Sequence, residues 1–507
     1  MVLAQSEFVV RPLDRGKELS GMGVPLVNHE QDARATERRM SDKATIPAPA
    51  EIIPAAVTPV EAGAFGSFAS GVSLTIATRL LMLVGTVGSS VIVGRWLGPE
   101  GLGSLAVLNT TIVLALSIGS LGLTSANTYF IAKDRRMLAP VWANAIVFAM
   151  FVGTLVAVVV VMLAKLKPVL FGDVSPDLIL IAALSIPFQF LLALGLNVLL
   201  AMDRIRQLNF MDALAPALAL INAVVVLLIV HSRLKLLVSF NTAATVGLSA
   251  VMLWVIARLV ARQKERTPFR PNGKLFKGAI TYGLRFCIPL MAAILIFRVD
   301  LLIVNHFRSA AEAGVYAVAS QVANLLTMLP GVIAMLLFPR VAFKQDPSGE
   351  FAVQVTRHVS FLMLIMCVAV AALSFVLPVI YGPRFADATI QLLILLPGVC
   401  LIGVESVLVQ HFTGTGLPVA IPVFWLITLT VSVGLNLALV PVFGARGAAV
   451  TSTLSYSLIF LFVAVYFCMK TGRRPLEIFL LRGREFRHLL AHVGLVSPAT
   501  CSANAPE

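Results

Sequence analysis

Charged residues are scarce in this chain. Only 13% of its 507 residues are Asp, Glu, Lys or Arg, whereas 58% are hydrophobic, and the mean hydropathy is +0.93. A typical soluble domain carries about 25% charged residues, so this chain has roughly half the charge needed to cover a surface in water. The composition therefore excludes an ordinary soluble enzyme and a disordered scaffold.

Cysteine and histidine are also few, and the common catalytic motifs are missing. The five cysteines form no Cys-x-x-Cys pair and the seven histidines show no metal-ligand spacing, which excludes a disulfide-built fold and argues against a structural metal. The sequence contains no G-x-x-x-x-G-K-[ST] loop and no G-x-S-x-G elbow, so we expect no ATP hydrolysis by the chain itself. We expect no enzyme, no cofactor and no metal.

What the chain has instead is a series of long apolar runs. A spanning helix needs about 20 mainly apolar residues, whereas barrel strands have about 10 residues and alternate. Only helices and closed barrels satisfy every backbone polar group in lipid, so the runs predict an all-α integral membrane protein. Twelve spans are expected, at residues 70–94, 102–131, 139–164, 178–201, 211–230, 237–257, 279–305, 313–338, 358–380, 388–411, 419–441 and 447–469.

The distribution of Lys and Arg predicts the orientation. With the N-terminus inside, 28 of the 39 basic residues fall in cytoplasmic segments and eight in outer loops, and Arg79, Arg285 and Arg298 lie inside helices. This bias predicts that both termini are cytoplasmic. It also explains the net charge of +14 without nucleic acid, because the excess faces the anionic headgroups of the inner leaflet.

Five regions follow from this map. We expect residues 1–66 to be a disordered cytoplasmic extension, since they are polar and no apolar run of signal-peptide length follows Met1. A basic cytoplasmic linker, residues 263–278, divides the spans into an N-terminal lobe, residues 67–262, and a C-terminal lobe. The C-terminal lobe covers residues 279–470, and the cytoplasmic tail beyond it carries apolar residues at the spacing of an interfacial helix.

The two lobes resemble each other in sequence. Three features recur at offsets of 210 or 211 residues: Phe171-Gly172 and Tyr381-Gly382, Pro187 and Pro397, and Gly103 and Gly314. Gly and Pro are common in membrane helices, so chance pairs are the alternative, but three pairs at nearly one offset favour a true repeat. Six helices per lobe make the repeat parallel, about an axis along the membrane normal, as in alternating-access carriers.

Several short motifs in sequence order carry a family resemblance. They are VGRWLGPEGLG at residues 93–103, GSLGLTSA at 119–126, RVD at 298–300, AGVYA at 313–317 and LFPR at 337–340. Together with the twelve spans they resemble the polysaccharide-flippase branch of the multidrug, oligosaccharidyl-lipid and polysaccharide exporter superfamily. The resemblance covers roughly residues 67–470.

The resemblance implies a fold and a function. The implied fold has two six-helix lobes in a V around a central cavity. The implied protein lies in the bacterial inner membrane and flips an undecaprenyl-diphosphate-linked oligosaccharide to the outer leaflet, for O-antigen, exopolysaccharide or capsule. The partners expected on this basis are the lipid-linked oligosaccharide, the membrane itself, and a polysaccharide polymerase with its chain-length machinery.

Two other functions stay open. The first is cation-coupled drug efflux on the same fold, against which the arginines inside the spans argue, because they would repel a cationic substrate. The second is a membrane polysaccharide polymerase or ligase. Such enzymes usually present a large outer loop with paired Arg or His residues, and the largest outer loop on this map has only about a dozen residues.

Arginines inside spans are the first candidates for binding the diphosphate. A charge there costs about 2.5–3.5 kcal/mol on insertion scales, so each one needs a reason, and a guanidinium binds phosphate oxygens in a bidentate way. Arg79 lies ~13 Å into the first span, on the same face as Thr75, Thr86 and Ser90. A packing role, with bonds to helix carbonyls, is its alternative. Arg298 lies nearer the outer end of its span and could also snorkel outward.

Polar stripes on two spans are candidates for binding sugar. Ser117, Thr124 and Asn127 follow one face of the second predicted span, and Ser320 and Asn324 follow one face of the eighth. Hydroxyl and amide groups suit hydrogen bonding to sugars in a wet cavity. Contact between helices is the alternative, because small polar residues are common at such interfaces.

Two acidic residues inside spans are candidates for ion coupling or for structural ion pairs. Asp300 lies two residues after Arg298, about 200° around the helix, so one straight face cannot hold both. Glu405 lies deep in the tenth span and needs a partner, for which an arginine or His411 is available.

Overall fold

The computed structural model describes residues 62–263, 267–334, 349–415 and 418–474. Within these residues every regular element is a helix. Most of the expected N-terminal extension, part of the linker and the expected interfacial helix lie outside the described residues. The chain divides into one unit of residues 10–75 and another that contains everything from Ile76 onward. Among the described residues, every segment long and apolar enough to cross a membrane lies in the second unit.

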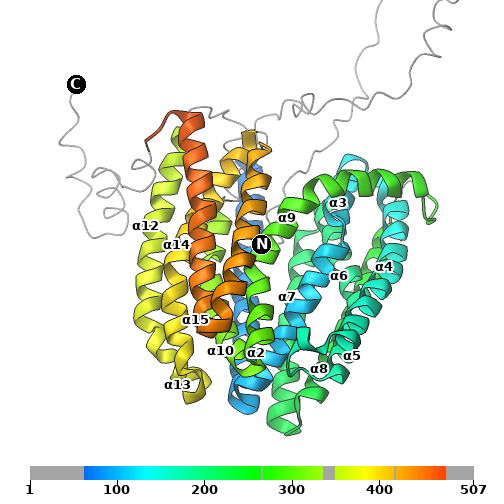
Figure 1. The fold of residues 1–507 in the computed structure, drawn as a ribbon. Helices are drawn as coiled ribbons and strands as arrows, with labels where there is room; N and C mark the ends of the chain where they lie inside the picture. Colours follow the sequence, from blue (N-terminus) through cyan, green and yellow to red (C-terminus); the bar gives the residue numbers. More distant parts are fainter. Residues whose placement is uncertain (1–61, 264–266, 335–348, 416–417, 475–507) are drawn as a thin grey trace, which may run out of the picture. The chain divides into compact units, whose positions relative to one another are not determined.

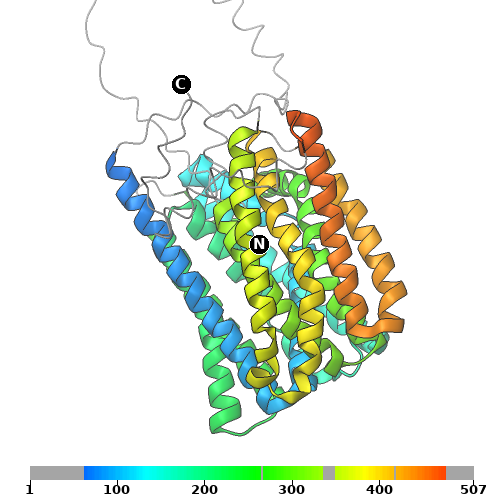
Figure 2. The same cartoon turned by 90° about the vertical axis from the view of Figure 1, so that its left-hand side faces the viewer.

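Ten helical segments among the described residues meet this criterion of length and composition. Two of them, Ala77–Gly119 in α2 (Ala62–Gly119) and α15 (Ala420–Thr471), have 43 and 52 residues, about twice the length that a bilayer needs. Each is broken by a glycine at positive φ, Gly98 (68°) in α2 and Gly444 (60°) in α15, a conformation that only glycine adopts readily. Figure 2 shows the two halves of α15 side by side. With these two breaks, the ten segments correspond to the twelve expected spans.

The other helices follow the expected spans, several of which are divided between two helices. They are α3 (Leu123–Lys133), α4 (Leu138–Leu166), α5 (Pro176–Ala183), α6 (Ile186–Ala201), α7 (Ile205–Ala223), α8 (Leu234–Ala261), α9 (Gly273–Phe307), α10 (Ala310–Leu326), α12 (Glu350–Leu373), α13 (Leu377–Tyr381) and α14 (Ala386–Thr415). Helix α12 starts eight residues before the expected span. As a result Arg357, which the sequence map placed in a cytoplasmic loop, lies in a helix and is buried.

The prediction of one continuous helix for the second span, residues 102–131, was wrong. It is broken between Gly119 and Leu123, because Leu121 and Gly122 have left-handed backbone angles, with φ of 49° and 71°. At this break the chain lies directly against α9: a Cβ added to Gly122 would be 2.8 Å from the Cα of Gly283. The glycine therefore serves both the turn and the close approach of two backbones.

The helices form two groups with α9 in contact with both. Helices α3, α4 and α5 pack with α6 and α8 in the N-terminal half, and α10, α12, α14 and α15 pack together in the C-terminal half (Figure 1). Helix α9 packs against α15 and also against α3. At its start, Asn272 and Asn144 exchange two hydrogen bonds, of 2.8 and 3.0 Å, which join α9 to α4.

The internal repeat is visible in matching ion pairs. Lys235 lies 2.9 Å from Asp177, and Arg446 lies 3.0 Å from Asp387. The two acids are 210 residues apart and the two bases 211. Gly172 and Gly382, which the sequence paired at the same offset, both have positive φ. These contacts agree with the predicted parallel repeat.

The two halves also exchange contacts near the break in α2. From the first half, Arg95 donates hydrogen bonds of 2.6 Å to the carbonyls of Val379 and Ile380 in α13. From the second half, the Nδ1 of His306 lies 2.7 Å from the carbonyl oxygen of Val169. Val169 and Val379 are 210 residues apart and so occupy equivalent positions in the two halves. A side chain from each half therefore hydrogen-bonds to the equivalent turn of the other half.

Candidate functional site

Arg79 forms an ion pair with a residue that the sequence analysis did not select. Its Nη2 lies 3.1 Å from a carboxylate oxygen of Asp212 in α7, and its Nη1 lies 3.4 Å from the sulfur of Met82. The side chains of Arg79 and Asp212 are 22% and 25% exposed. Asp212 stands seven residues after the start of α7, about 10 Å along its axis. The pair therefore lies within two spans and remains reachable from outside the protein.

Close packing holds α2 against α7 independently of this pair. A Cβ added to Gly85 would lie 2.9 Å from the carbonyl oxygen of Pro216, and one added to Gly88 would lie 3.1 Å from Leu220. The two backbones therefore touch two turns beyond Arg79. Small residues at such crossings let membrane helices approach closely.

Arg298 and Asp300 point in different directions, as their spacing requires. Arg298 is exposed, whereas Asp300 is buried. Tyr316 of α10 donates a hydrogen bond of 2.5 Å to Asp300, Ser452 of α15 donates one of 3.0 Å, and the backbone N–H of Leu301 donates a third, of 2.7 Å. Asp300 therefore joins three helices through hydrogen bonds to hydroxyl and backbone groups.

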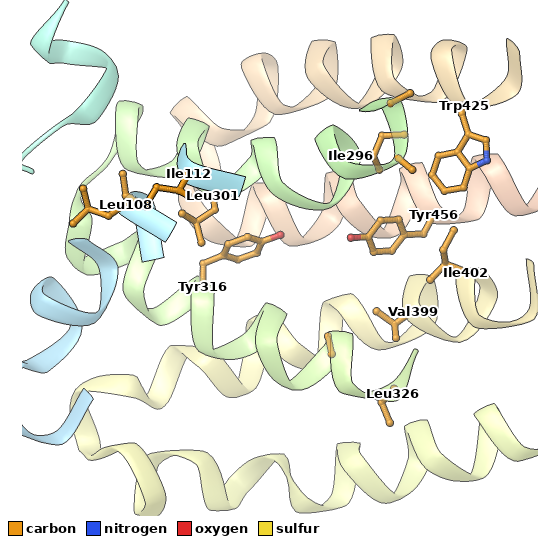
Figure 3. Close-up of a cluster of buried hydrophobic side chains, with 14 of the residues drawn as sticks. Leu108, Ile112, Ile296, Leu301, Tyr316, Leu326, Val399, Ile402, Trp425 and Tyr456 are labelled. Atoms are coloured by element: carbon orange, nitrogen blue, oxygen red, sulfur yellow. The ribbon is translucent and has the colours of Figure 1, made fainter. Parts of the chain in front are cut away.

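A second tyrosine, Tyr456, lies near Tyr316. Figure 3 shows the hydroxyl groups of Tyr316 and Tyr456 pointing toward each other, within a cluster of buried apolar side chains. The ring of Tyr456 also contacts that of Phe297, with centroids 5.1 Å apart. Hydroxyls around a buried carboxylate can stabilise its charge or hold a proton beside it, so the cluster suits either a structural or an ion-coupling role.

The two polar stripes differ in their surroundings. Ser117 lies before the break in the second span, whereas Thr124 and Asn127 lie after it, so the stripe does not follow one continuous helix. Asn127 is buried, and its Nδ2 has no hydrogen-bond partner among the described residues. Ser320 is half-buried and donates to the carbonyl of Ala317 in its own helix.

Asn324 and Glu405 complete the set of expected residues. Asn324 is half-buried in α10, and its backbone carbonyl accepts a hydrogen bond from Thr327. Glu405 is buried in α14, and its Oε1 has no hydrogen-bond partner among the described residues.

The residues that the sequence analysis missed had detectable signals. Asp212 is an acid at the inner end of a predicted span, which by itself asks for a basic partner such as Arg79. Ser452 and Tyr456 had weaker signals, since their roles depend on how α15 lies against Asp300. Among the described residues, no group of three His, Cys, Asp or Glu side chains is placed to hold a metal ion.

Comparison with known families identifies the chain. Residues 67–343, a little over half of the sequence, match the family described as polysaccharide biosynthesis protein. The chain belongs to this family. The match covers the whole N-terminal half of the membrane region, including Arg79 and Asp212, and reaches through α10. It confirms the resemblance noted in the sequence.

A curated relative and several solved structures are also similar to this family member. A segment of 167 residues is 27% identical to the probable flippase AglR of Haloferax volcanii, covering 31% of this chain and about a third of that protein. The structure of the lipid II flippase MurJ matches with a TM-score of 0.67 at 13% identity, over 85% of this chain and 93% of MurJ. An inward-facing multidrug transporter of the MATE family matches with a TM-score of 0.63 at 12% identity, over 79% and 98%. At such identities the structural matches establish the fold, which is the two-lobe fold of these transporters.

Proposed function

We propose that this chain is a flippase of the bacterial inner membrane that translocates an undecaprenyl-diphosphate-linked oligosaccharide by alternating access, without catalysing a reaction. The observation that carries the proposal is an arginine inside a span, Arg79, in a member of the polysaccharide biosynthesis family. A diphosphate crossing a low-dielectric region needs a cation near its path, and a guanidinium offers the bidentate geometry that suits it. The name of the relative AglR, a probable flippase, supports the same activity.

In this proposal the polar side chains have separate tasks. Arg79 binds the diphosphate, and Arg298, which is exposed, offers a second cation. Ser117, Thr124, Ser320 and Asn324 hydrogen-bond to sugar, and none of the four is fully buried. Asn127 is buried, so sugar reaches it only if the neighbouring helices move. Both termini lie in the cytoplasm, and a polymerase with its chain-length machinery receives the product.

A cation-coupled efflux carrier is the second candidate, and one observation favours it. The fold is shared with multidrug transporters of the MATE family, and Asp300 and Glu405 are buried carboxyl groups without a basic hydrogen-bond partner among the described residues. Such groups can bind a proton or a cation during transport. Under the main proposal, the same two acids couple flipping to an ion gradient.

Reconstitution separates the two candidates. Purified full-length protein is placed in vesicles that contain a lipid-linked oligosaccharide in the inner leaflet only. The flippase proposal expects the oligosaccharide to become accessible to an added glycosidase in proportion to the protein present. Efflux of a cationic dye from these vesicles, without transfer of the lipid, would support the carrier and overturn the flippase.

A further inference from the structure

The ion pair between Arg79 and Asp212 raises a question that helix packing does not answer. The contact of α2 with α7 is already made by Gly85 against Pro216 and by Gly88 against Leu220. The pair is therefore not needed to bring the two helices together. A charged pair placed in a span without a packing task calls for another explanation.

The geometry of the pair leaves Arg79 able to bind another anion. One guanidinium nitrogen, Nη2, lies within ion-pair distance of the carboxylate, and Nη1 faces the weak acceptor Met82. A guanidinium has five N–H donors in a planar fork, so a single contact uses a small part of its capacity. Both side chains are about a quarter exposed, and a ligand can reach them.

We propose that Asp212 is an exchangeable counter-anion, which occupies Arg79 between transport cycles and gives it up to the diphosphate of the lipid carrier. This inference rests on the proposed function. Without cargo, Asp212 spares Arg79 the cost of an unpaired charge within a span. With cargo, the two phosphate groups offer bidentate contacts that the single carboxylate contact does not match.

The same carboxylate promotes release. Once the diphosphate is bound, Asp212 lies beside a second negative group, and their repulsion raises the free energy of the loaded state. A transport site must bind well enough to load and weakly enough to unload. Asp212 is thus a positioning residue that sets the affinity of Arg79, rather than a residue that contacts the substrate.

Binding of a short polyprenyl diphosphate tests this inference. The probe is farnesyl diphosphate, titrated into purified full-length protein in detergent, with farnesol as the control that lacks the diphosphate. We expect Asp212→Asn to bind the probe about 1.5- to fivefold more tightly, the range that corresponds to the strength of an exposed ion pair. Asp212→Glu retains the charge and is expected to bind as the parent does. Arg79→Ala and the double variant Arg79→Ala/Asp212→Asn are expected to bind equally weakly.

Two further readouts separate the outcomes. Flipping by Asp212→Asn in vesicles should be slower at saturating substrate despite its tighter binding. Asp177→Asn, which breaks an exposed ion pair with Lys235, should change neither the binding of the probe nor the flipping rate. If Asp212→Asn binds the probe no more tightly than the parent and only loses thermal stability, the pair is structural and this inference is overturned. If no variant binds the probe in an Arg79-dependent way, the proposed flippase function itself fails.

Discussion

Gly103 and Gly314 face each other backbone to backbone. A Cβ added to either glycine would lie 2.8 Å from the backbone nitrogen of the other. The two residues are 211 positions apart and were paired by the sequence repeat. When equivalent residues of two repeats contact each other reciprocally, the axis that relates them passes between them. The axis of this repeat therefore passes between the second half of α2 and the start of α10.

A side chain at this contact is expected to destabilise the protein. Gly103→Ala places a methyl group against the backbone of α10, and overpacking of this kind costs about 1–3 kcal/mol. We expect a lower unfolding temperature and less inserted protein. Gly247→Ala in α8 is the matched control, because a Cβ there would meet nothing within 4 Å. Equal stability of the two variants would show that the backbones do not touch.

Removing the cation that holds α13 is expected to loosen that helix locally. In Arg95→Ala, the carbonyls of Val379 and Ile380 lose their hydrogen bonds from the guanidinium, worth about 0.5–1.5 kcal/mol each. Hydrogen exchange of residues 377–385 should become faster. Arg446→Ala, which breaks an exposed ion pair within one half, should leave this exchange nearly unchanged. Faster exchange in Arg446→Ala but not in Arg95→Ala would show that Arg95 does not stabilise α13.

The hydroxyl groups around Asp300 are expected to matter for stability. Tyr316→Phe removes one donor from a buried carboxylate, which costs about 1–3 kcal/mol. Ser320→Ala, one turn further along α10, removes a hydroxyl that donates to the carbonyl of Ala317 in its own helix and should cost much less. Thermal unfolding of the two variants in the same detergent measures the difference. A larger loss in Ser320→Ala would contradict the assigned hydrogen bonds.

The orientation can be tested with reporter fusions. The bias of basic residues predicts that fusions at Lys167, Lys235 and Arg384 report the outer side, and that fusions at Arg136 and Arg270 report the cytoplasm. All five positions lie in turns between helices or at helix ends. A reversed result at two or more positions would invalidate the map.

The fold was largely predictable because a lipid bilayer restricts the structures that can cross it. A span needs a long apolar run, so helix existence and most ends followed from composition alone. The break at Leu121 and Gly122 was missed, because its cause is the approach of Gly283, more than 150 residues away. Arg357 was misplaced because the length of an apolar run does not show how far its helix extends beyond that run.

The site was less predictable because pairing depends on helix neighbours. The positions of Arg79 and Asp300 inside predicted spans were enough to identify them as charges that need partners. Which partners they have depends on the packing of α7 against α2, and of α10 and α15 against α9. The separation of Arg298 from Asp300 was predictable, since helical geometry alone places them on different faces.

The central claim is that Arg79 binds the diphosphate of the transported lipid. It is tested most directly by measuring lipid-linked oligosaccharide flipped in vesicles per molecule of correctly inserted protein. We expect Arg79→Ala to lose nearly all of this activity. Arg79→Lys should keep only part, because an ammonium replaces the bidentate fork. If Arg79→Ala flips the lipid at the parental rate per inserted molecule, Arg79 is not a substrate ligand and the account is contradicted.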